Sequence, residues 1–384
     1  MPTSTTSRPN KSADVVIVGA GVIGLSIGRA LTLRGISNVT LLERGQPGTE
    51  ASWAAAGILA PQVEVDHADD FFRLAAASRD MYPAWADSLQ SETGMDVELD
   101  RTGTIYVGFS EADEAELQSR SDWQKSEGLC VEWLSADETR KLEPCVSSEV
   151  RCALRFPNDY QVENRRLIKA LLSANENLGV YLITECNVNE LLIENDKVRG
   201  VNTSLGWIAA PIVVLAAGAW TSLIDSGFRG PRIEPVRGQM LCFETPTPVT
   251  KHVIYSARGY LVPRRDGRLL AGSTSERVGF DKRVTAAGVN AIRSMANEIA
   301  PALTGIEPAD SWSGFRPRGM DDWPVLGPCE ETAGLYYATG HYRNGILLAP
   351  ITGELIAAAI VESAVPAAIR AFSPERFRAL AESR

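Results

Sequence analysis

The chain has 384 residues, of which 45% are hydrophobic and 22% charged, and its formal net charge is −10. This length exceeds what one minimal core needs and predicts two closely joined domains. The acidic balance argues against nucleic acid or an anionic membrane as a partner, and no uncharged apolar stretch is long enough to span a membrane.

The chain begins with a polar segment and a β-α-β pattern. Residues 1–12 lack the apolar stretch of a secretory signal, so we expect a disordered extension. Residues 13–18 form an apolar run typical of a buried parallel strand. Helical spacing follows over residues 22–34 and ends at Gly35, and residues 39–42 resemble a second strand.

Later segments alternate between helical and strand patterns. The spacing predicts helices over residues 71–92, 111–127, 165–178, 286–300 and 345–362. Strands are expected over residues 180–183, 188–193, 198–201 and 208–215, and strands dominate residues 236–272, with a turn at Arg265, Asp266 and Gly267. Residues 131–159 are expected to be rich in loops.

Segments typical of a nucleotide-binding fold occur at the beginning, middle and end of the chain. We therefore expect a discontinuous nucleotide-binding domain made of residues 13–85, 150–230 and 310–370. Residues 86–149 and 231–309 would form a substrate domain inserted into it. The fold class is α/β.

Residues 15–24 read VVIVGAGVIG and contain a G-x-G-x-x-G motif at Gly19, Gly21 and Gly24. The first glycine permits the tight turn, the second lets the backbone approach a pyrophosphate, and the third lets the helix pack on the strand. The N-terminus of the helix then supplies N–H groups for phosphate oxygens. A strand precedes the motif and a helix follows it, which favours a dinucleotide site over a purely structural turn.

Two further features indicate which nucleotide binds. Glu43 ends the second expected strand, where a carboxylate accepts hydrogen bonds from ribose hydroxyls and repels the 2′-phosphate of NADP. Residues 51–64 read ASWAAAGILAPQVE, and the small residues Ala54, Ala55, Ala56 and Gly57 allow the backbone to approach a flat ring. An ordinary tightly packed turn would use the same residues.

Taken together, several motifs resemble the glycine oxidase branch of the D-amino-acid oxidase superfamily. They are VVIVGAGVIG, LLERG, ASWAAAGILAPQVE, VVLAAGAW, YLVPR, GFRPRGMDDWPVLG and GHYRNGILLAP, and the resemblance covers residues 13–370. It implies a glutathione-reductase-like Rossmann domain that binds FAD, with an inserted α+β substrate domain built on a mixed sheet. It also implies non-covalent FAD, because Cys329 lies past the position at which related enzymes attach their flavin.

The resemblance assigns FAD contacts along the whole chain. These residues are Gly19, Gly21, Val22, Ile23, Gly24, Glu43, Arg44, Ala51, Ser52, Ala56, Gly57, Ile58, Val188, Gly218, His341, Tyr342, Arg343, Asn344, Gly345, Ile346 and Leu347. We expect a helix that begins near Gly345 to direct its N-terminus at the flavin, where the helix dipole stabilises negative charge on the reduced ring.

Three residues are implied as catalytic. A planar guanidinium suits a carboxylate because it binds with two parallel hydrogen bonds, and Arg316 is the expected clamp. Tyr260 is expected to donate to the same carboxylate, and Arg343 to lie beside the substrate. The alternatives are a surface cation for Arg316, a core aromatic for Tyr260 and an ion-pair residue beside the flavin for Arg343.

The implied reaction is the oxidative deamination of glycine by O2 to glyoxylate, ammonia and hydrogen peroxide, which would also serve synthesis of the thiazole of thiamine. Arg258 and Ser275 depart from the glycine oxidase pattern, so sarcosine and small D-amino acids stay open as substrates. The alternatives are a D-amino-acid dehydrogenase that reduces a quinone, a non-catalytic nucleotide-fold binding protein and the flavin module of a tRNA-modifying enzyme.

The remaining expectations concern metals and surroundings. Six scattered cysteines without a Cys-x-x-Cys pair and only three histidines argue against a metal centre and indicate a reducing compartment, so we expect a cytoplasmic protein. The expected partners are a small amino acid and O2, with no nucleic acid and no membrane. The resemblance implies a homo-oligomer, such as a tetramer.

Overall fold

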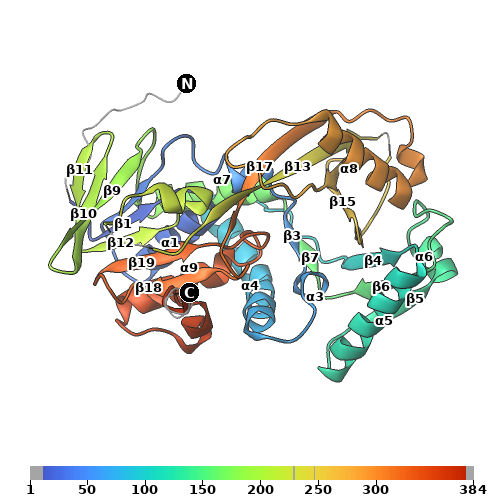
Figure 1. Ribbon diagram of the computed structural model, residues 1–384, viewed down its shortest axis with the longest axis horizontal. Helices are drawn as coiled ribbons and strands as arrows, with labels where there is room; N and C mark the ends of the chain where they lie inside the picture. Colours follow the sequence, from blue (N-terminus) through green and yellow to red (C-terminus); the bar gives the residue numbers. More distant parts are fainter. Residues whose placement is uncertain (1–11, 228–229, 246, 378–384) are drawn as a thin grey trace.

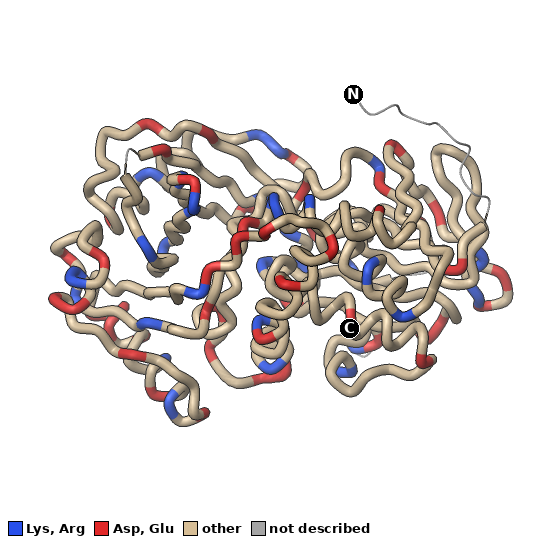
Figure 2. The backbone as a smooth tube through the Cα atoms, turned by 180° about the vertical axis from the view of Figure 1, so that it is seen from behind, with Lys and Arg blue, Asp and Glu red and all other residues tan. Residues whose placement is uncertain are grey.

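The computed structural model describes residues 12–227, 230–245 and 247–377. Two large sheets form the two halves of the molecule, with α4 (Asp70–Thr93) between them (Figure 1). Acidic and basic positions are interspersed along the backbone of both halves (Figure 2). The predicted α/β class is confirmed.

The first half is built on a six-stranded sheet in the order β18-β19-β12-β1-β2-β8. Five of its strands are parallel, and β18 is antiparallel to β19 at one edge. Their bounds are β1 (Val15–Val18), β2 (Val39–Leu42), β8 (Tyr181–Ile183), β12 (Ile212–Leu215), β18 (Val325–Pro328) and β19 (Leu335–Thr339). The central strands read as continuous apolar runs because both faces of the sheet are covered.

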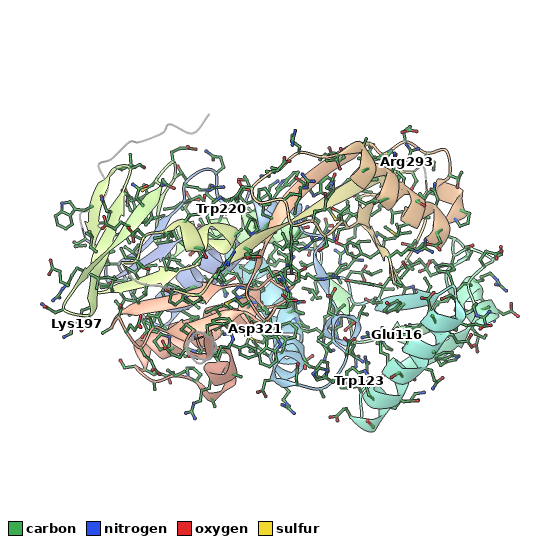
Figure 3. The ribbon with its side chains drawn as sticks, viewed as in Figure 1. Glu116, Trp123, Lys197, Trp220, Arg293 and Asp321 are labelled. Atoms are coloured by element: carbon green, nitrogen blue, oxygen red, sulfur yellow. The ribbon has the colours of Figure 1, made fainter. Side chains whose placement is uncertain are left out.

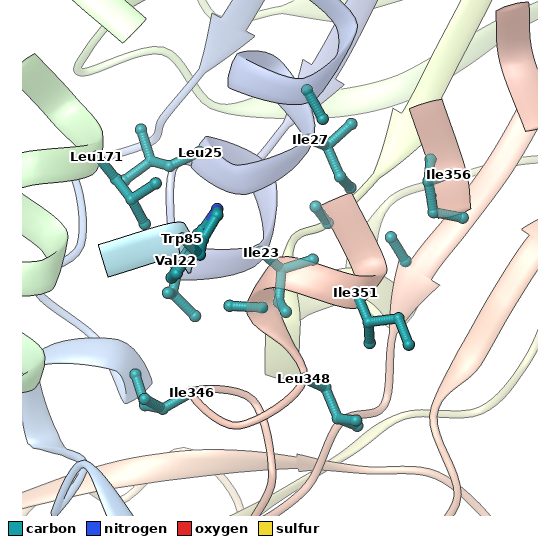
Figure 4. Close-up of a cluster of buried hydrophobic side chains, with 14 of the residues drawn as sticks. Val22, Ile23, Leu25, Ile27, Trp85, Leu171, Ile346, Leu348, Ile351 and Ile356 are labelled. Carbon is teal, nitrogen blue, oxygen red and sulfur yellow. The ribbon is translucent and has the colours of Figure 1, made fainter. Parts of the chain in front are cut away.

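Helices α1 (Val22–Leu33), α7 (Asn164–Asn177) and α9 (Ala349–Val361) pack together beside this sheet. Leu25 of α1, Leu171 of α7 and Ile356 of α9 are fully buried in one cluster with Trp85 of α4 (Figure 4). Burying side chains of this size stabilises the fold by about 1.5–3 kcal/mol each. This core fixes the N-terminus of α1, which carries the glycine motif.

The second half is an eight-stranded mixed sheet in the order β17-β13-β16-β15-β14-β4-β6-β5, in which only the β14–β4 pair is parallel within the described residues. The bounds are β4 (Thr104–Gly108), β5 (Glu132–Ser135), β6 (Cys152–Phe156), β13 (Glu234–Glu244), β14 (Val253–Ser256), β15 (Gly259–Pro263), β16 (Arg268–Gly272) and β17 (Asp310–Arg318). Helices α6 (Ala136–Leu142) and α8 (Ala286–Ile299) pack on one face, and α5 (Glu111–Ser126) packs on the other.

Two smaller sheets and several short helices complete the fold. The antiparallel strands β9 (Val188–Glu194), β10 (Lys197–Thr203) and β11 (Gly206–Ala209) form a three-stranded sheet, and β3 (Ile58–Leu59) pairs with β7 (Tyr160–Gln161). The short helices are α2 (Ala51–Ala54), α3 (Pro61–Glu64), and the 3-10 helices η1 (Gly218–Leu223), η2 (Pro301–Leu303) and η3 (Ala367–Phe372).

Five predicted helices match α1, α4, α5, α7 and α8 within two residues, but three other predictions are wrong. The stretch 131–159 contains β5, α6 and β6 in addition to its loops. The expected strand 208–215 is two strands of different sheets, β11 and β12, separated at Pro211, which lacks a backbone donor for a continuing ladder. The last long helix begins at Ala349 and not near Gly345 because residues 342–348 form turns.

The expected domain boundaries remain a prediction. Strands β6 and β17 both belong to the eight-stranded sheet. The sequence, however, assigns residues 150–230 and 310–370, which contain these strands, to the nucleotide-binding domain. Residues 1–11 of the expected extension lie outside the described residues, and Ser12 forms a bridge with Ala209. Across the described ranges, we find no helix with the length and apolar character needed to cross a membrane.

Candidate active site

A cavity of about 440 Å³ is lined by residues from both halves of the molecule. One end lies at the turn between β1 and α1, and the other end lies against the eight-stranded sheet, where Tyr260 and Arg316 face it. All of the expected FAD contacts line this cavity except Gly24 and Leu347, and all three expected catalytic residues line it too.

The glycine motif forms the first end of the cavity. Gly19 has a φ of +105°, and a Cβ atom there would lie 2.5 Å from the carbonyl oxygen of Ala216. A Cβ at Gly24 would overlap the carbonyl oxygen of Gly19, so this glycine brings α1 close to the turn and does not line the cavity. Gly21 is the N-cap of α1 and has no side chain to occupy the space at the helix N-terminus. The turn is therefore open to a phosphate group.

Two polar side chains hold this turn in place. The carboxylate of Glu43 accepts hydrogen bonds from the N–H of Ala20 and of Gly45, each at 3.0 Å. The Ser52 hydroxyl accepts from the N–H of Val22 at 3.0 Å. Glu43 thus lies at the carboxyl end of β2, at the edge of the cavity, where the sequence predicted a ribose-binding carboxylate.

Arg44, the next expected contact, lies over an aromatic ring. Its guanidinium carbon is 3.7 Å from the centre of the Trp220 ring, and it forms an ion pair with Glu50 at 3.0 Å. Trp220, on η1, lies near the junction of the two halves (Figure 3). Gly218 begins the same 3-10 helix, and Val188 begins β9 at this end of the cavity.

Residues Ala56 to Ile58 form another wall of the cavity. Gly57 has a φ of +70°, and a Cβ atom there would overlap the carbonyl oxygen of Val162. Behind this wall, the buried guanidinium of Arg264 donates a 2.8 Å hydrogen bond to the carbonyl oxygen of Ala56. The backbone here is held close to the cavity, as a flat ring requires.

The segment from His341 to Ile346 forms the facing wall. The N–H of Tyr342 donates to the carbonyl oxygen of Pro317 at 2.9 Å, and the Tyr82 hydroxyl donates to the carbonyl oxygen of Ile346. Burial lowers the pKa of His341 to about 3, so its ring is neutral at neutral pH. Leu347 is buried and does not line the cavity, and its carbonyl oxygen accepts from Ser78 of α4 at 2.6 Å.

Because α9 begins at Ala349, the proposed helix N-terminus at Gly345 is wrong. A turn stands in its place, closed by a 2.8 Å hydrogen bond from the N–H of Leu348 to the carbonyl oxygen of Asn344. Gly345 and Ile346 still line the cavity through this turn. Charge on a ring there would therefore face turn backbone instead of the first residue of a helix.

Arg316 and Tyr260 meet at the hydroxyl of Ser273. Arg316 Nη2 donates to Ser273 Oγ at 2.6 Å, Arg316 Nη1 donates to the carbonyl oxygen of Thr274 at 3.0 Å, and the Tyr260 hydroxyl lies 3.3 Å from Ser273 Oγ. A Cβ at Gly238 would overlap the Arg316 guanidinium, so glycine makes room for it. Among the described residues, Arg316 forms no ion pair with an acidic side chain. Its charge is available to an anionic ligand.

Arg343 forms an ion pair with an acidic side chain. This agrees with the alternative that Arg343 is an ion-pair residue beside the flavin. Arg343 Nε lies 3.0 Å from Glu64 Oε2, and the Tyr255 hydroxyl donates to Glu64 Oε1 at 2.7 Å. Burial by itself raises the pKa of the Glu64 carboxyl, but the Arg343 charge and the two hydrogen bonds outweigh it and hold the pKa below its usual range. Glu64 is therefore a carboxylate at neutral pH.

The residues at this end of the cavity that sequence reasoning missed include Glu64, Met240, Tyr255 and Ser273. Glu64 ends the motif ASWAAAGILAPQVE, so the signal was present but carried no assigned role. Arg258 and Ser275, which the sequence singled out, do not line the cavity. Arg258 is exposed and pairs with Glu298.

The donor set fits a flavin dinucleotide. The glycine turn is open to phosphates, a carboxylate lies at the carboxyl end of β2, where a ribose would need an acceptor, and close-packed backbone suits a flat ring. By contrast, a search of the described residues finds no group of three or more His, Cys, Asp or Glu side chains that could hold a metal ion.

Comparisons with known proteins agree with this geometry. Residues 14–359 match the family model described as FAD dependent oxidoreductase. The chain is 36% identical to a glycine oxidase of Pseudomonas aeruginosa over 90% of this chain and 94% of that protein. It is 37% identical to the bifunctional protein ThiO/ThiG of Trichormus variabilis, over 95% of this chain and 55% of that protein.

A solved structure shows the same arrangement. The crystal structure of glycine oxidase from Geobacillus kaustophilus superposes with a TM-score of 0.91 at 35% identity, over 96% of this chain and 99% of that one. The fold therefore matches a known architecture.

Proposed function

This chain belongs to the FAD dependent oxidoreductase family, among the glycine oxidases, and we propose that it oxidises the carbon–nitrogen bond of glycine with O2. One water is consumed when the imine is hydrolysed, and the products would be glyoxylate, ammonia and hydrogen peroxide. The observation that carries the proposal is the position of Arg316, whose guanidinium has no acidic partner among the described residues and lies on the wall of the cavity that the glycine turn also lines.

When bound, FAD supplies the acceptor for the hydride that leaves the substrate. The chain's own part is to hold the substrate in place. Arg316 would bind the carboxylate with two parallel hydrogen bonds, and Ser273 and Thr274 keep its guanidinium from rotating. Tyr260 shares the Ser273 hydroxyl and would donate to the same carboxylate.

The walls of this end restrict substrate size. The rings of Tyr255 and Tyr260 lie 5.3 Å apart, and Met240 is within 3.5 Å of the Tyr260 hydroxyl. These three buried side chains leave room for a small amino acid, which supports glycine and keeps sarcosine and small D-amino acids as further proposed substrates.

Several finer proposals accompany the main one. Non-covalent FAD is supported by the cavity wall, on which the one cysteine among the described residues is Cys186, at the nucleotide end. Residence in the cytoplasm, assembly as a homo-oligomer such as a tetramer, and a role in making the thiazole of thiamine remain proposals. No observation favours the dehydrogenase, the non-catalytic protein or the tRNA-modifying module.

The decisive experiment follows the colour of the purified flavoprotein. Under anaerobic conditions, glycine should bleach the flavin absorbance, and admission of air should restore it with release of one hydrogen peroxide per glyoxylate. Bleaching that is reversed by a quinone but not by air would instead identify a dehydrogenase. A colourless protein that takes up no FAD would refute the proposal.

A further inference from the structure

We propose that Glu64 determines substrate specificity: by occupying Arg343, it limits the enzyme to amines with a single acidic group and excludes those with a second one. This inference rests on the proposed function because it concerns the same substrate. Sequence reasoning gave Glu64 no role, and hydride transfer from a neutral amine does not require a carboxylate at this position.

Glu64 and Arg343 form a bidentate ion pair. Arg343 Nε lies 3.0 Å from one carboxylate oxygen of Glu64, and Arg343 Nη2 donates to the other at 3.1 Å. The Tyr255 hydroxyl adds a third donor to the carboxylate. A guanidinium held in this way has one of its two carboxylate-binding edges occupied, and its charge is already matched by an acidic partner.

Glu64 has little freedom to move aside. It ends the short helix α3, and the carbonyl oxygens of the two preceding residues are held by α5. Gln124 Nε2 donates to the carbonyl oxygen of Gln62 at 2.8 Å, and Arg120 Nη1 donates to that of Val63 at 3.0 Å. The Glu64 side chain is only 15% exposed, and Glu64 is one of the residues that line the cavity.

The charges at this end of the cavity match one carboxylate. Arg316 and Arg343 are positive and Glu64 is negative, so the three side chains together carry one positive charge. A carboxylate on Arg316 neutralises it. A second carboxylate on the same ligand would lie near Glu64 without a free cation, and a buried charge without a partner is strongly unfavourable.

The reduced basicity of Glu64 argues against the other role for a carboxylate here. Its pKa is held low by Arg343 and by the hydrogen bonds, although burial opposes this. A carboxylate with such a low pKa is a poor general base for a substrate ammonium group. Glu64 is better suited to fixing charge than to moving a proton.

The test compares a diacid with a monoacid in wild type and in E64Q, which keeps the shape of the side chain and removes its charge. Iminodiacetate and glycine serve as substrates, and malonate and acetate as non-oxidisable ligands whose Kd is read from the flavin spectrum. Because E64Q releases the Arg343 charge for a second carboxylate, it should raise the iminodiacetate/glycine ratio of kcat/KM, and the malonate/acetate ratio of affinities, by at least about tenfold.

Two further variants separate charge from a loosened pocket. Y255F removes a hydrogen bond to Glu64 but keeps the carboxylate, so both ratios should stay at their wild-type values. In the double variant E64Q/R343M, no cation is released, so the gain seen in E64Q should disappear.

Unchanged ratios in E64Q would overturn the inference, as would an equal rise in Y255F. The malonate/acetate ratio tests Glu64 even if wild type fails to oxidise glycine. Failure of the proposed function and failure of this inference are therefore distinguishable.

Discussion

Removal of the Arg316 guanidinium tests the geometry on which the proposed function depends. In Arg316→Ala, the substrate carboxylate would lose both hydrogen bonds and the charge that attracts it. Glycine has few other atoms with which to bind, so its capture should suffer far more than the grip on FAD. The glycine turn that holds the nucleotide is built by other residues, such as Glu43 and Ser52.

The size of the effect follows from the hydrogen bonds lost. Hydrogen bonds to charged groups contribute about 1.5–3 kcal/mol each, so two of them correspond to a fall in kcat/KM of about 10²- to 10⁴-fold. Arg316→Lys keeps the charge but not the planar guanidinium, so its kcat/KM should lie between those of wild type and Arg316→Ala. Ser273 and Thr274 would no longer position the side chain in either variant.

The assay is steady-state peroxide release at varied glycine, with bound FAD measured from the visible spectrum. Arg258→Ala is the matched control, because Arg258 is exposed, pairs with Glu298 and does not line the cavity. It should change kcat/KM less than about twofold. Loss of flavin from Arg316→Ala together with an unchanged KM would show that Arg316 binds the cofactor and not the substrate.

Three further predictions concern the cofactor turn, a buried acid and a buried cation. Gly19→Ala should lose FAD, measured as flavin per chain, because its positive φ and the 2.5 Å approach to Ala216 leave no room for a Cβ. Burial raises the pKa of Asp159 to about 8, and the fully buried carboxyl holds its proton in the folded chain but releases it near pH 4 in the unfolded chain. The free energy of unfolding should therefore fall as pH rises between these values, by up to about 1.4 kcal/mol per pH unit. Asp159→Asn should flatten the Tm–pH profile. Parallel Tm–pH profiles for wild type and Asp159→Asn would contradict this reasoning. Arg264→Met should lower Tm by several degrees and shift the bound flavin spectrum, because it leaves the buried carbonyl oxygen of Ala56 without its donor; an unchanged spectrum would count against this role.

The glycine turn shows what the sequence determined well. Gly19, Gly21 and Gly24 lie within six residues, and the strand, turn and helix around them depend on local backbone geometry. A local pattern of this kind is readable because its parts are adjacent in the chain. The placement of Arg316 and Tyr260 on one cavity was likewise predicted, through motifs that resemble a family.

Other predictions failed because the deciding contacts are not local. Residues 208–215 are apolar on both sides of Pro211, and only the pairing shows that β11 and β12 belong to different sheets. The start of α9 at Ala349 depends on α4, where Ser78 and Tyr82 hold the carbonyl oxygens of the preceding turn. An apolar pattern does not reveal either contact.

The sequence by itself determined the nucleotide turn, the alternation of strands and helices, and the identity of the cationic residues. Only the tertiary structure decided which cation is left for a ligand. Glu64 lies 279 residues from Arg343 in the chain, and the fold brings the two together while Arg316 has no acidic partner among the described residues. Whether two charged side chains form an ion pair depends on their distance in space, and the packing of the two sheets sets that distance.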